Sequence, residues 1–267
     1  MCGGLAGVAY LIPQSAAWSS QAPIPGALSP DDQALAFRKF AYATGPEPGF
    51  WWLQGRRYGL VDNLPTPLWD MHIGLVFRTR DLPGGGWEVR SIAQSFYTDV
   101  DNGTFLRTFR NPYTGEDIEI FYFPPAAASV RYRGLKVEPK TPAPGLKITD
   151  TVGGARFDGG VLTIRSDHCV SGVFSGKPIR VNDLSTYVGA IGDFHDSTVT
   201  MAPASQTFND FNSWPDWFRM GDRPGTYMSR AYGRKAFAFA DMPAIWRRLL
   251  KEAHPDLAED PVGALGA

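Results

Sequence analysis

Apolar side chains recur at every second position over much of the chain after residue 49, which is the spacing of strands with one buried face. Turns rich in glycine and proline, such as Pro83-Gly84-Gly85-Gly86, separate these runs. The pattern predicts an antiparallel meander of short strands. The expected strands occupy residues 50–60, 68–80, 87–97, 104–110, 117–123, 161–170, 197–201 and 226–239.

Helical signals are confined to two segments. At Ser29-Pro30-Asp31-Asp32, a capping serine, a first-turn proline and two carboxylates precede the apolar positions Ala34, Leu35, Phe37, Phe40 and Ala41. A second helix is expected to begin at Asp241-Met242-Pro243 and to end before Pro255. We therefore expect a mainly β protein, an antiparallel β-barrel or strongly curved sheet with an N-terminal and a C-terminal helix.

The chain is expected to contain one large domain. A chain of 267 residues, of which 43% are hydrophobic, can bury one sizeable core. We assign residues 29–256 to this barrel-like domain, residues 1–28 to a surface arm and residues 257–267 to a frayed tail. Five prolines between residues 124 and 145 indicate a long surface connection within the domain.

Charge and cysteine content exclude several kinds of partner. Lys and Arg number 26 against 27 for Asp and Glu, a net charge of -1, so no long-range attraction favours nucleic acid or an anionic membrane. The weakly apolar residues 5–12 are too few to span a bilayer and lack the basic start of a secretory signal. Cys2 and Cys169 give no disulfide framework. We expect a cytoplasmic protein, with a cleaved upstream leader as the alternative.

Asp70 and His72 lie on one face of the expected strand over residues 68–80, whereas the odd-numbered positions from Trp69 to Phe77 are apolar. If the polar face lines a barrel interior, the carboxylate can hold the imidazole tautomer and raise its basicity, as a general base requires. If that face is solvated, both are ordinary surface residues. The sequence leaves both alternatives open.

His168 alternates in register with Leu162, Ile164 and Val170, so we expect it to be buried. A buried imidazole is either a neutral core residue or an acid or base at a pocket wall. The sequence has no histidine pair with metal-ligand spacing, no nucleophile elbow and no phosphate-binding loop, so we expect no metal and no cofactor. Residues 99–103 are expected to form an Asx-rich turn rather than a calcium loop.

Residues 208–218, with the sequence Phe-Asn-Asp-Phe-Asn-Ser-Trp-Pro-Asp-Trp-Phe, are unusually aromatic. Rings that bury area beside amides that fix orientation suit a pocket for a flat, partly polar molecule, although such a segment can also cap a core. We take Tyr97 and Arg107 as catalytic candidates that would steady a developing oxyanion, beside His72, His168 and Asp70. The substrate-binding candidates are Trp52, Tyr58, Tyr122, Asn212, Trp214 and Trp217.

Three segments together carry a family resemblance. They are Tyr97-Thr98-Asp99 with Asn102-Gly103-Thr104, the turn Asn111-Pro112-Tyr113-Thr114-Gly115-Glu116, and residues 208–217 with Gly221 and Pro224-Gly225. The chain resembles the bacterial family known as domain of unknown function 1838 (DUF1838), over most of its length. The resemblance implies no particular reaction.

These residues favour a cofactor-independent lyase, dehydratase or isomerase acting on an aromatic small molecule, for example a lignin-derived phenol that loses water or formaldehyde. The alternative is a carrier barrel that binds a hydrophobic ligand without chemistry. A third class is a structural subunit whose aromatic segment is an interface, and a homo-oligomer stays open. A proton-transfer group that reaches the ligand cavity would favour the enzyme over the carrier.

Overall fold

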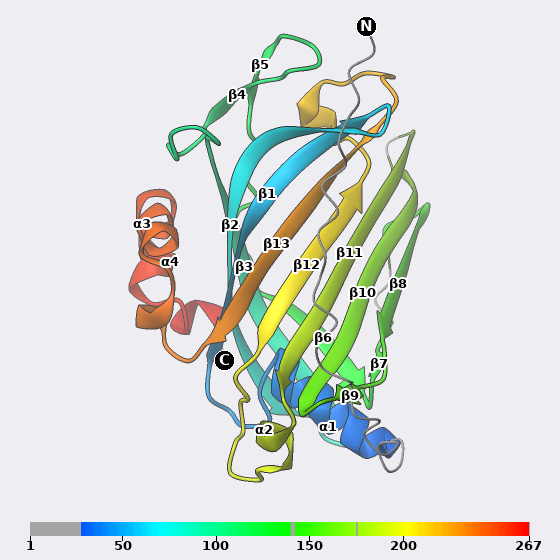
Figure 1. The fold of residues 1–267 in the computed structure, drawn as a ribbon, viewed down its shortest axis with the longest axis vertical. Coiled ribbons are helices and arrows are strands. Elements are labelled where there is room, and N and C mark those ends of the chain that lie inside the picture. The colour runs from blue at the N-terminus through cyan, green and yellow to red at the C-terminus, as the bar shows by residue number, and fades with distance from the viewer. Residues whose placement is uncertain (1–27, 140–141, 175, 267) are drawn as a thin grey trace, which may run out of the picture.

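One large antiparallel sheet dominates the computed structural model, which describes residues 28–139, 142–174 and 176–266. Its strand order is β7-β6-β3-β2-β1-β13-β12-β11-β10-β8, with β9 paired to β10 (Figure 1). The strands are β1 (Gly49–Val61), β2 (Leu64–Asp81), β3 (Trp87–Thr98), β6 (Ala128–Arg133), β7 (Lys136–Val137), β8 (Leu146–Val152), β9 (Arg156–Asp158), β10 (Val161–Phe174), β11 (Lys177–Ala190), β12 (Ser205–Asn212) and β13 (Thr226–Ala236).

The sheet curves until its two edge strands, β7 and β8, contact each other, which gives a nearly closed barrel. A Cβ on Gly55 of β1 would meet the backbone of β13, and a Cβ on Gly233 of β13 would meet the backbone of β1. A bulge between Arg57 and Tyr58 also shifts the register of β1 against β2. Glycines and bulges of this kind permit sharp bending, so these positions let the central strands curve. The prediction of a mainly β, barrel-like fold is confirmed.

Helix α1 (Pro30–Ala41) plugs the end of the sheet that lies at the bottom of Figure 1. Its predicted start is confirmed, because Ser29 Oγ accepts a hydrogen bond from the backbone N–H of Asp32 at 3.1 Å. Phe37 is fully buried and packs against rings from the neighbouring strands β6 and β3 and from β11, which lies toward the other edge of the sheet. Those rings belong to Trp87 of β3, Tyr132 of β6 and Tyr187 of β11.

Helices α3 (Ala244–Ala253) and α4 (Pro255–Glu259) and the 3-10 helix η3 (Gly263–Leu265) lie on the outer face of β2 and β3, with α3 and α4 at the left of Figure 1. The predicted second helix is thus present, and it ends before Pro255. The frayed end expected from residue 257 is not observed. Leu257 and Leu265 are buried in a second, outer core with Val76, Ile92 and Phe96. These apolar side chains fix the end of the described chain against the barrel.

Several expected segments are corrected. The connection predicted over residues 124–145 contains β6 and β7, because its prolines flank these strands instead of interrupting them. The strand expected at 197–201 is a turn that follows α2 (Ile191–His195), and the 104–110 run reduces to β4 (Thr108–Arg110), which pairs with β5 (Asp117–Glu119) in a separate hairpin. The strand β11 was not predicted. Residues 1–27 of the predicted arm lie outside the described residues.

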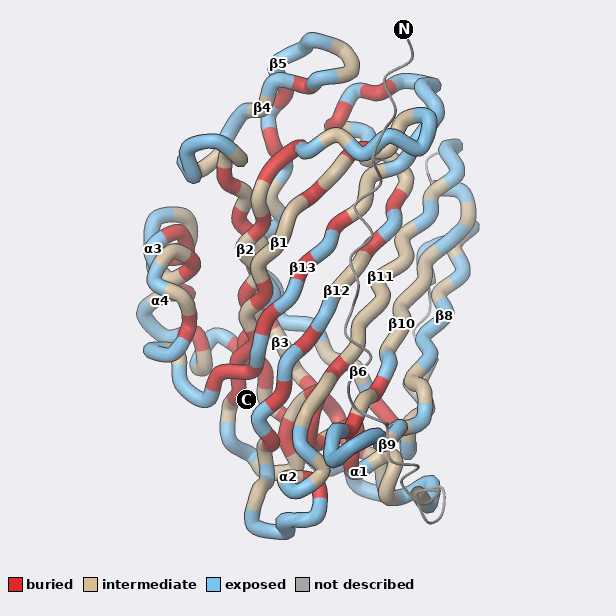
Figure 2. The backbone as a smooth tube through the Cα atoms, in the orientation of Figure 1, coloured by how far each residue is buried: buried red, intermediate tan, exposed pale blue. Residues whose placement is uncertain are grey.

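Two other local features bear on the site. The Asx-rich turn is confirmed, since Asp99 Oδ1 accepts hydrogen bonds from the backbone N–H groups of Asp101 and Asn102. The aromatic segment begins inside β12, continues through the 3-10 helix η1 (Asp216–Phe218) and is therefore not a loop throughout. A further 3-10 helix, η2 (Phe239–Asp241), precedes α3. Figure 2 shows burial alternating along β2 and β13, as a two-sided barrel wall requires.

Because α1 plugs the barrel, substitutions at a buried and at an exposed position of this helix should lower the free energy of unfolding by very different amounts. Phe37→Ala should lower the free energy of unfolding by about 3–5 kcal/mol, because it opens a cavity among rings from three strands. Leu35→Ala in the same helix is the matched control, since Leu35 is 43% exposed, and it should cost less than about 1 kcal/mol. Urea unfolding of both variants measures this; equal losses would show that α1 does not plug the barrel.

Candidate functional site

The barrel wall places the predicted histidines on opposite faces. Trp69, Met71 and Phe77 belong to the interior core, so Asp70 and His72, at the intervening positions of β2, face outward. His168 of β10 shares the interior-facing register of Leu162 and Ile164, as predicted. The side chain of His168 is 44% exposed, which corrects the expectation that it is buried.

Cross-strand register aligns charged side chains at one level of the interior. His168 of β10 stands opposite Asp150 of β8 on one side and Asp183 of β11 on the other. Asp183 in turn stands opposite Asp210 of β12. Asp210 stands opposite Ser229 of β13, and Ser229 stands opposite Arg57 of β1. We call this set the interior belt: Asp150, His168, Asp183, Asp210 and Arg57.

Arg57 and Asp210 form the buried end of the interior belt. Arg57 Nη2 donates to Asp210 Oδ2 at 2.8 Å, with both side chains at most 10% exposed. The guanidinium also lies over the ring of Tyr227, 4.4 Å from its centroid. The second carboxylate oxygen, Asp210 Oδ1, is buried and has no hydrogen-bond partner among the described residues. It is an acceptor available to a neighbouring acid or to a bound molecule.

Asp183 has a strongly perturbed environment. Burial, together with the nearby carboxylate of Asp210, raises the pKa of Asp183 to about 6, and the charges of His168 and Arg57 only partly oppose this rise. A carboxyl group of this pKa changes protonation close to neutral pH, so it can act as an acid or as a base.

His168 and Asp150 form the other end of the interior belt, where His168 Nδ1 lies 2.5 Å from Asp150 Oδ1. A carboxylate at Nδ1 favours the tautomer that carries its proton there, which leaves the lone pair on Nε2. The side chains keep 44% and 27% exposure, in contrast to the Arg57–Asp210 pair. This end of the interior belt is therefore the accessible one.

An aromatic cluster adjoins the buried end. Trp217 stacks on Trp69 at a centroid distance of 6.1 Å, and Trp214 stacks on Phe218 at 5.1 Å. Burial raises the pKa of the nearby Tyr97 phenol, which stays neutral at pH 7. The indole N–H groups of Trp69 and Trp214 are buried without a hydrogen-bond partner in the part of the chain that the structure describes. Both are donors that an oxygen-bearing ligand could satisfy.

The Asn-Pro-x-Thr-Gly turn holds this cluster in place. Asn111 is fully buried and its Nδ2 donates to the carbonyl of Phe218 at 2.7 Å. The side chain of Asn212 is also buried, and its Oδ1 accepts from the backbone N–H of Asn182 at 3.1 Å. Tyr113 of the turn also packs against Trp214 with ring centroids 5.6 Å apart, so two of the three segments that carry the family resemblance are in direct contact.

Other predicted site residues lie elsewhere. Trp52 points to the outer face, where Arg234 lies 5.9 Å from its ring centroid. The Tyr122 hydroxyl donates to the carbonyl of Leu106 at 2.6 Å, and its ring stacks on Tyr97 at 5.4 Å, at the edge of the aromatic cluster. Arg107 is 71% exposed and pairs with Glu252 at 3.4 Å. The structure does not bring Arg107 to the interior belt, because it precedes β4 in an irregular segment that lies against α3.

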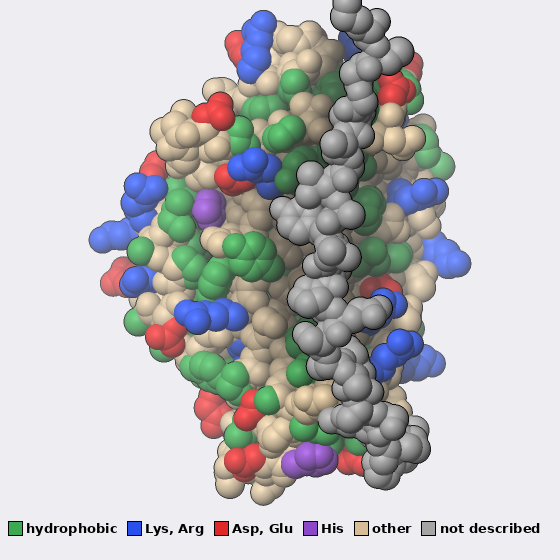
Figure 3. Space-filling view, in the orientation of Figure 1, with side chains coloured by type: hydrophobic (Ala, Val, Ile, Leu, Met, Phe, Trp, Pro, Cys, Tyr) green, Lys and Arg blue, Asp and Glu red, His purple; other side chains and the backbone are tan. Residues whose placement is uncertain are grey.

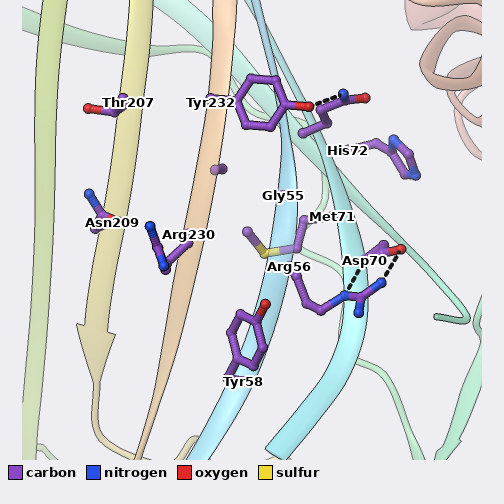
Figure 4. Close-up of a pocket in the computed structure, with 12 residues that line it drawn as sticks. Gly55, Arg56, Tyr58, Asp70, Met71, His72, Thr207, Asn209, Arg230 and Tyr232 are labelled. Carbon is purple, nitrogen blue, oxygen red and sulfur yellow. Dashed lines mark hydrogen bonds and ion pairs between the residues drawn. The ribbon is translucent and has the colours of Figure 1, made fainter. Parts of the chain in front are cut away.

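Asp70, His72 and Tyr58 line an open groove of about 750 Å³ on the outer face (Figure 4). Asp70 is bound by Arg56 through two hydrogen bonds, of 2.6 and 3.1 Å, since these residues stand directly opposite each other in β1 and β2. His72 Nε2 lies 3.2 Å from Thr98 Oγ1, and burial lowers the pKa of His72. The predicted pairing of Asp70 with His72 is therefore replaced by Asp70 with Arg56.

Four members of the interior belt were not predicted from the sequence: Arg57, Asp150, Asp183 and Asp210. Arg57 carried a usable signal, because it continues the inward-facing odd register of Trp51 and Leu53 in a run that is otherwise apolar. Asp183 and Asp210 carried none, since β11 has no clear alternation and residue 210 sits in a segment read as a loop. Among the described residues, no group of three or more His, Cys, Asp or Glu side chains is arranged to hold a metal ion.

The interior belt predicts a pH dependence of stability. Because the pKa of Asp183 is higher in the folded protein than its ordinary value of 3.8, the folded state binds this proton more tightly. The resulting stability is present below about pH 4 and is lost as the pH rises through about 6. Asp183→Asn should remove this loss, on the order of 2 kcal/mol between pH 4 and pH 8, relative to the wild type.

Denaturant unfolding at pH 4, 6 and 8 measures that difference. Asp167→Asn is the matched control, because Asp167 lies on the outward-facing register of β10, next to His168 in sequence. An Asp183→Asn profile parallel to that of the wild type would contradict the raised pKa.

Comparisons with protein-family models, with curated proteins and with solved structures found no match to this chain. Membership of the DUF1838 family therefore stays a prediction. In the described part of the chain, no helix has the length and apolar character needed to cross a bilayer.

Proposed function

We propose that the protein is a cofactor-independent acid–base enzyme, a lyase, dehydratase or isomerase, that acts on a small phenolic molecule at the interior belt. The observation that carries the proposal is Asp183, a carboxyl group with a pKa of about 6 that stands between a histidine and a buried carboxylate. Titratable groups shifted toward neutral pH inside a fold gather at catalytic sites more than elsewhere.

The accessible end of the interior belt supplies the base. His168 Nε2 would remove a proton from the substrate, while Asp150 holds Nδ1 and stabilises the imidazolium that forms. Asp183, when protonated, would deliver a proton to the leaving group. Arg57 would stabilise negative charge that develops on an oxygen, although its bond to Asp210 limits how far it can turn toward the substrate.

A phenol with a benzylic hydroxyl group shows how these roles balance. The base takes the phenolic proton, and the electron pair of the phenolate moves through the ring to expel the benzylic hydroxyl, which leaves as water with the proton from the acid. The neutral quinone methide then loses a proton from the adjacent carbon to the deprotonated acid, so that an alkene forms and the ring regains aromaticity as a phenolate. The phenolate takes back the proton that the base holds, which restores both enzyme groups. The net change is the loss of one water, with no change in oxidation state and no metal required.

The aromatic cluster supports an aromatic substrate. Tyr97 and Trp69 adjoin Arg57, and Trp217 stacks on Trp69. The two unpartnered indole N–H groups are suited to phenolic or ether oxygens. The same features would serve a carrier of hydrophobic ligands, which is the alternative function. A carrier gains nothing from the Asp183–His168 pair, and for this reason we favour the enzyme. The DUF1838 relationship and a cytoplasmic location are part of this proposal.

The two histidines give a matched test. His168→Gln should lower turnover by about 10² to 10⁴ fold with ligand affinity nearly unchanged, because it removes the base but leaves the rings in place. His72→Gln should leave turnover within about twofold, since His72 lies on the outer face. Asp150→Asn should cost less than His168→Gln, because Asp150 acts only through the imidazole.

The substrate for this test comes from the protein itself. Mass spectrometry of small molecules that copurify with it identifies a ligand, which is assayed together with phenols bearing benzylic hydroxyl or hydroxymethyl groups, with release of water or formaldehyde as the readout. Turnover that survives in His168→Gln but falls in His72→Gln would move the reaction to the outer face. Binding without turnover of any of these compounds would favour the carrier.

A further inference from the structure

The groove on the outer face is a second feature that the proposed function does not use. It is lined by side chains from four adjacent strands, β12, β13, β1 and β2, and has a volume of about 750 Å³. On the face shown in Figure 3, one histidine and a few charged side chains lie over β1, β2 and β13, among hydrophobic ones. The side chains that form the groove are Gln54, Arg56, Tyr58, Asp70, His72, Thr207, Asn209, Arg230 and Tyr232.

Two arginines stand side by side at its centre. Arg56 of β1 and Arg230 of β13 are directly opposite each other in the antiparallel register. Like charges in this arrangement repel each other and destabilise a sheet. The charge of Arg56 is neutralised by Asp70, whose carboxylate accepts two hydrogen bonds from the guanidinium. Arg230 has no hydrogen-bond or ion-pair partner among the described residues, and Figure 4 draws no contact from it to any other lining residue.

The charge of the groove therefore favours one negative group. Two guanidinium groups face one carboxylate, and burial lowers the pKa of His72, which keeps the imidazole neutral at pH 7. One positive charge remains in excess. A guanidinium binds a planar carboxylate through two parallel hydrogen bonds, which makes a carboxylate the best match for Arg230.

The rest of the lining suits a ring with polar substituents. Tyr58 and Tyr232 offer ring faces on the two sides of the arginine pair along the strands (Figure 4). The Tyr232 hydroxyl is held by Gln54 Nε2 at 2.9 Å, which fixes that ring although Tyr232 is 59% exposed. Asn209 and Thr207 add neutral hydrogen-bonding groups next to Arg230.

We infer that this groove is a binding site for an aromatic carboxylate, with the carboxylate on Arg230 and the ring against Tyr232 or Tyr58. The site is separate from the interior belt, because its side chains lie on the opposite face of the same strands. Arg56 and Arg57 are consecutive in β1 and point to opposite sides of the wall. The inference does not depend on the proposed reaction.

The test uses benzoate as the probe and benzyl alcohol as its neutral counterpart, because neither carries the phenol that the reaction proposed for the interior belt requires. Isothermal titration calorimetry should show binding of the acid to the wild type at neutral pH, and binding of the alcohol should be weaker by about ten- to a hundredfold, as expected for loss of a charge-assisted hydrogen bond. Arg230→Gln should weaken binding of the acid by a similar factor. This variant removes a repulsive neighbour of Arg56, so it should fold at least as stably as the wild type.

Two matched variants separate this site from the others. Arg165→Gln removes one positive charge from an exposed, outward-facing position of β10 and should leave the affinity unchanged. Asp183→Asn alters the interior belt and should also leave it unchanged. Binding that is lost in Asp183→Asn but kept in Arg230→Gln would place the probe in the interior and overturn the inference, as would equal losses in Arg230→Gln and Arg165→Gln. Absence of binding to the wild type at millimolar probe would overturn it too, whatever turnover His168 supports.

Discussion

The buried ion pair between Arg57 and Asp210 is the interaction on which the interior of this barrel depends. Two charges inside a wall of aromatic side chains cost several kcal/mol each to desolvate unless they meet each other. Their 2.8 Å contact joins β1 to β12 across β13, and the Tyr227 ring covers the guanidinium. Burial raises the pKa of the neighbouring Asp183, the carboxylate of Asp210 adds to this rise, and Arg57 partly opposes it. The acid–base character of the interior belt therefore depends on burial and on the charges that this pair holds in the wall.

The barrel wall keeps two different chemistries apart. Alternation of side chains across each strand sends Arg57 inward and Arg56 outward, although they are neighbours in the sequence. The inner face carries three groups of side chains: the rings packed around α1, the aromatic cluster near Trp69, and the interior belt. The outer face is apolar where α3 and α4 cover it and polar in the groove beside them. A single β wall can therefore support a reaction inside and a binding groove outside.

Much of the fold could be predicted from the sequence, since alternation and turn residues depend on local geometry. The start of α1 at Ser29, the second helix and the long strands β1, β2, β3, β10 and β13 all follow from such patterns. The strand β11 could not, because its inward positions carry Asp183 and Ser185 and so lack apolar alternation. Residues of the interior belt are polar, so they are missed when an interior face is identified by apolar alternation alone.

The site was predicted less well for a related reason. The roles expected for Asp70 and His72 depend on whether they face the barrel interior or the outside. The alternation in the sequence shows that they share one face of the strand but does not show which face is inside. His168 was identified because its neighbours in register are apolar, and the tryptophans of the 208–218 segment because they are concentrated there. The partners that perturb these residues come from strands far away in sequence: Asp150 lies 18 residues from His168, and Asp210 lies 153 residues from Arg57. The order and register of the strands in the sheet bring them together.

A double-mutant cycle on Arg57 and Asp210 tests the central claim most directly. Arg57→Met and Asp210→Leu should each lower the free energy of unfolding by about 3–5 kcal/mol, because each leaves an uncompensated buried charge. The double variant should recover most of this loss, which gives a coupling energy of about 2 kcal/mol or more in urea unfolding. Losses that add to within about 0.5 kcal/mol would show that the two charges do not depend on each other, and the account of the barrel interior would then be wrong.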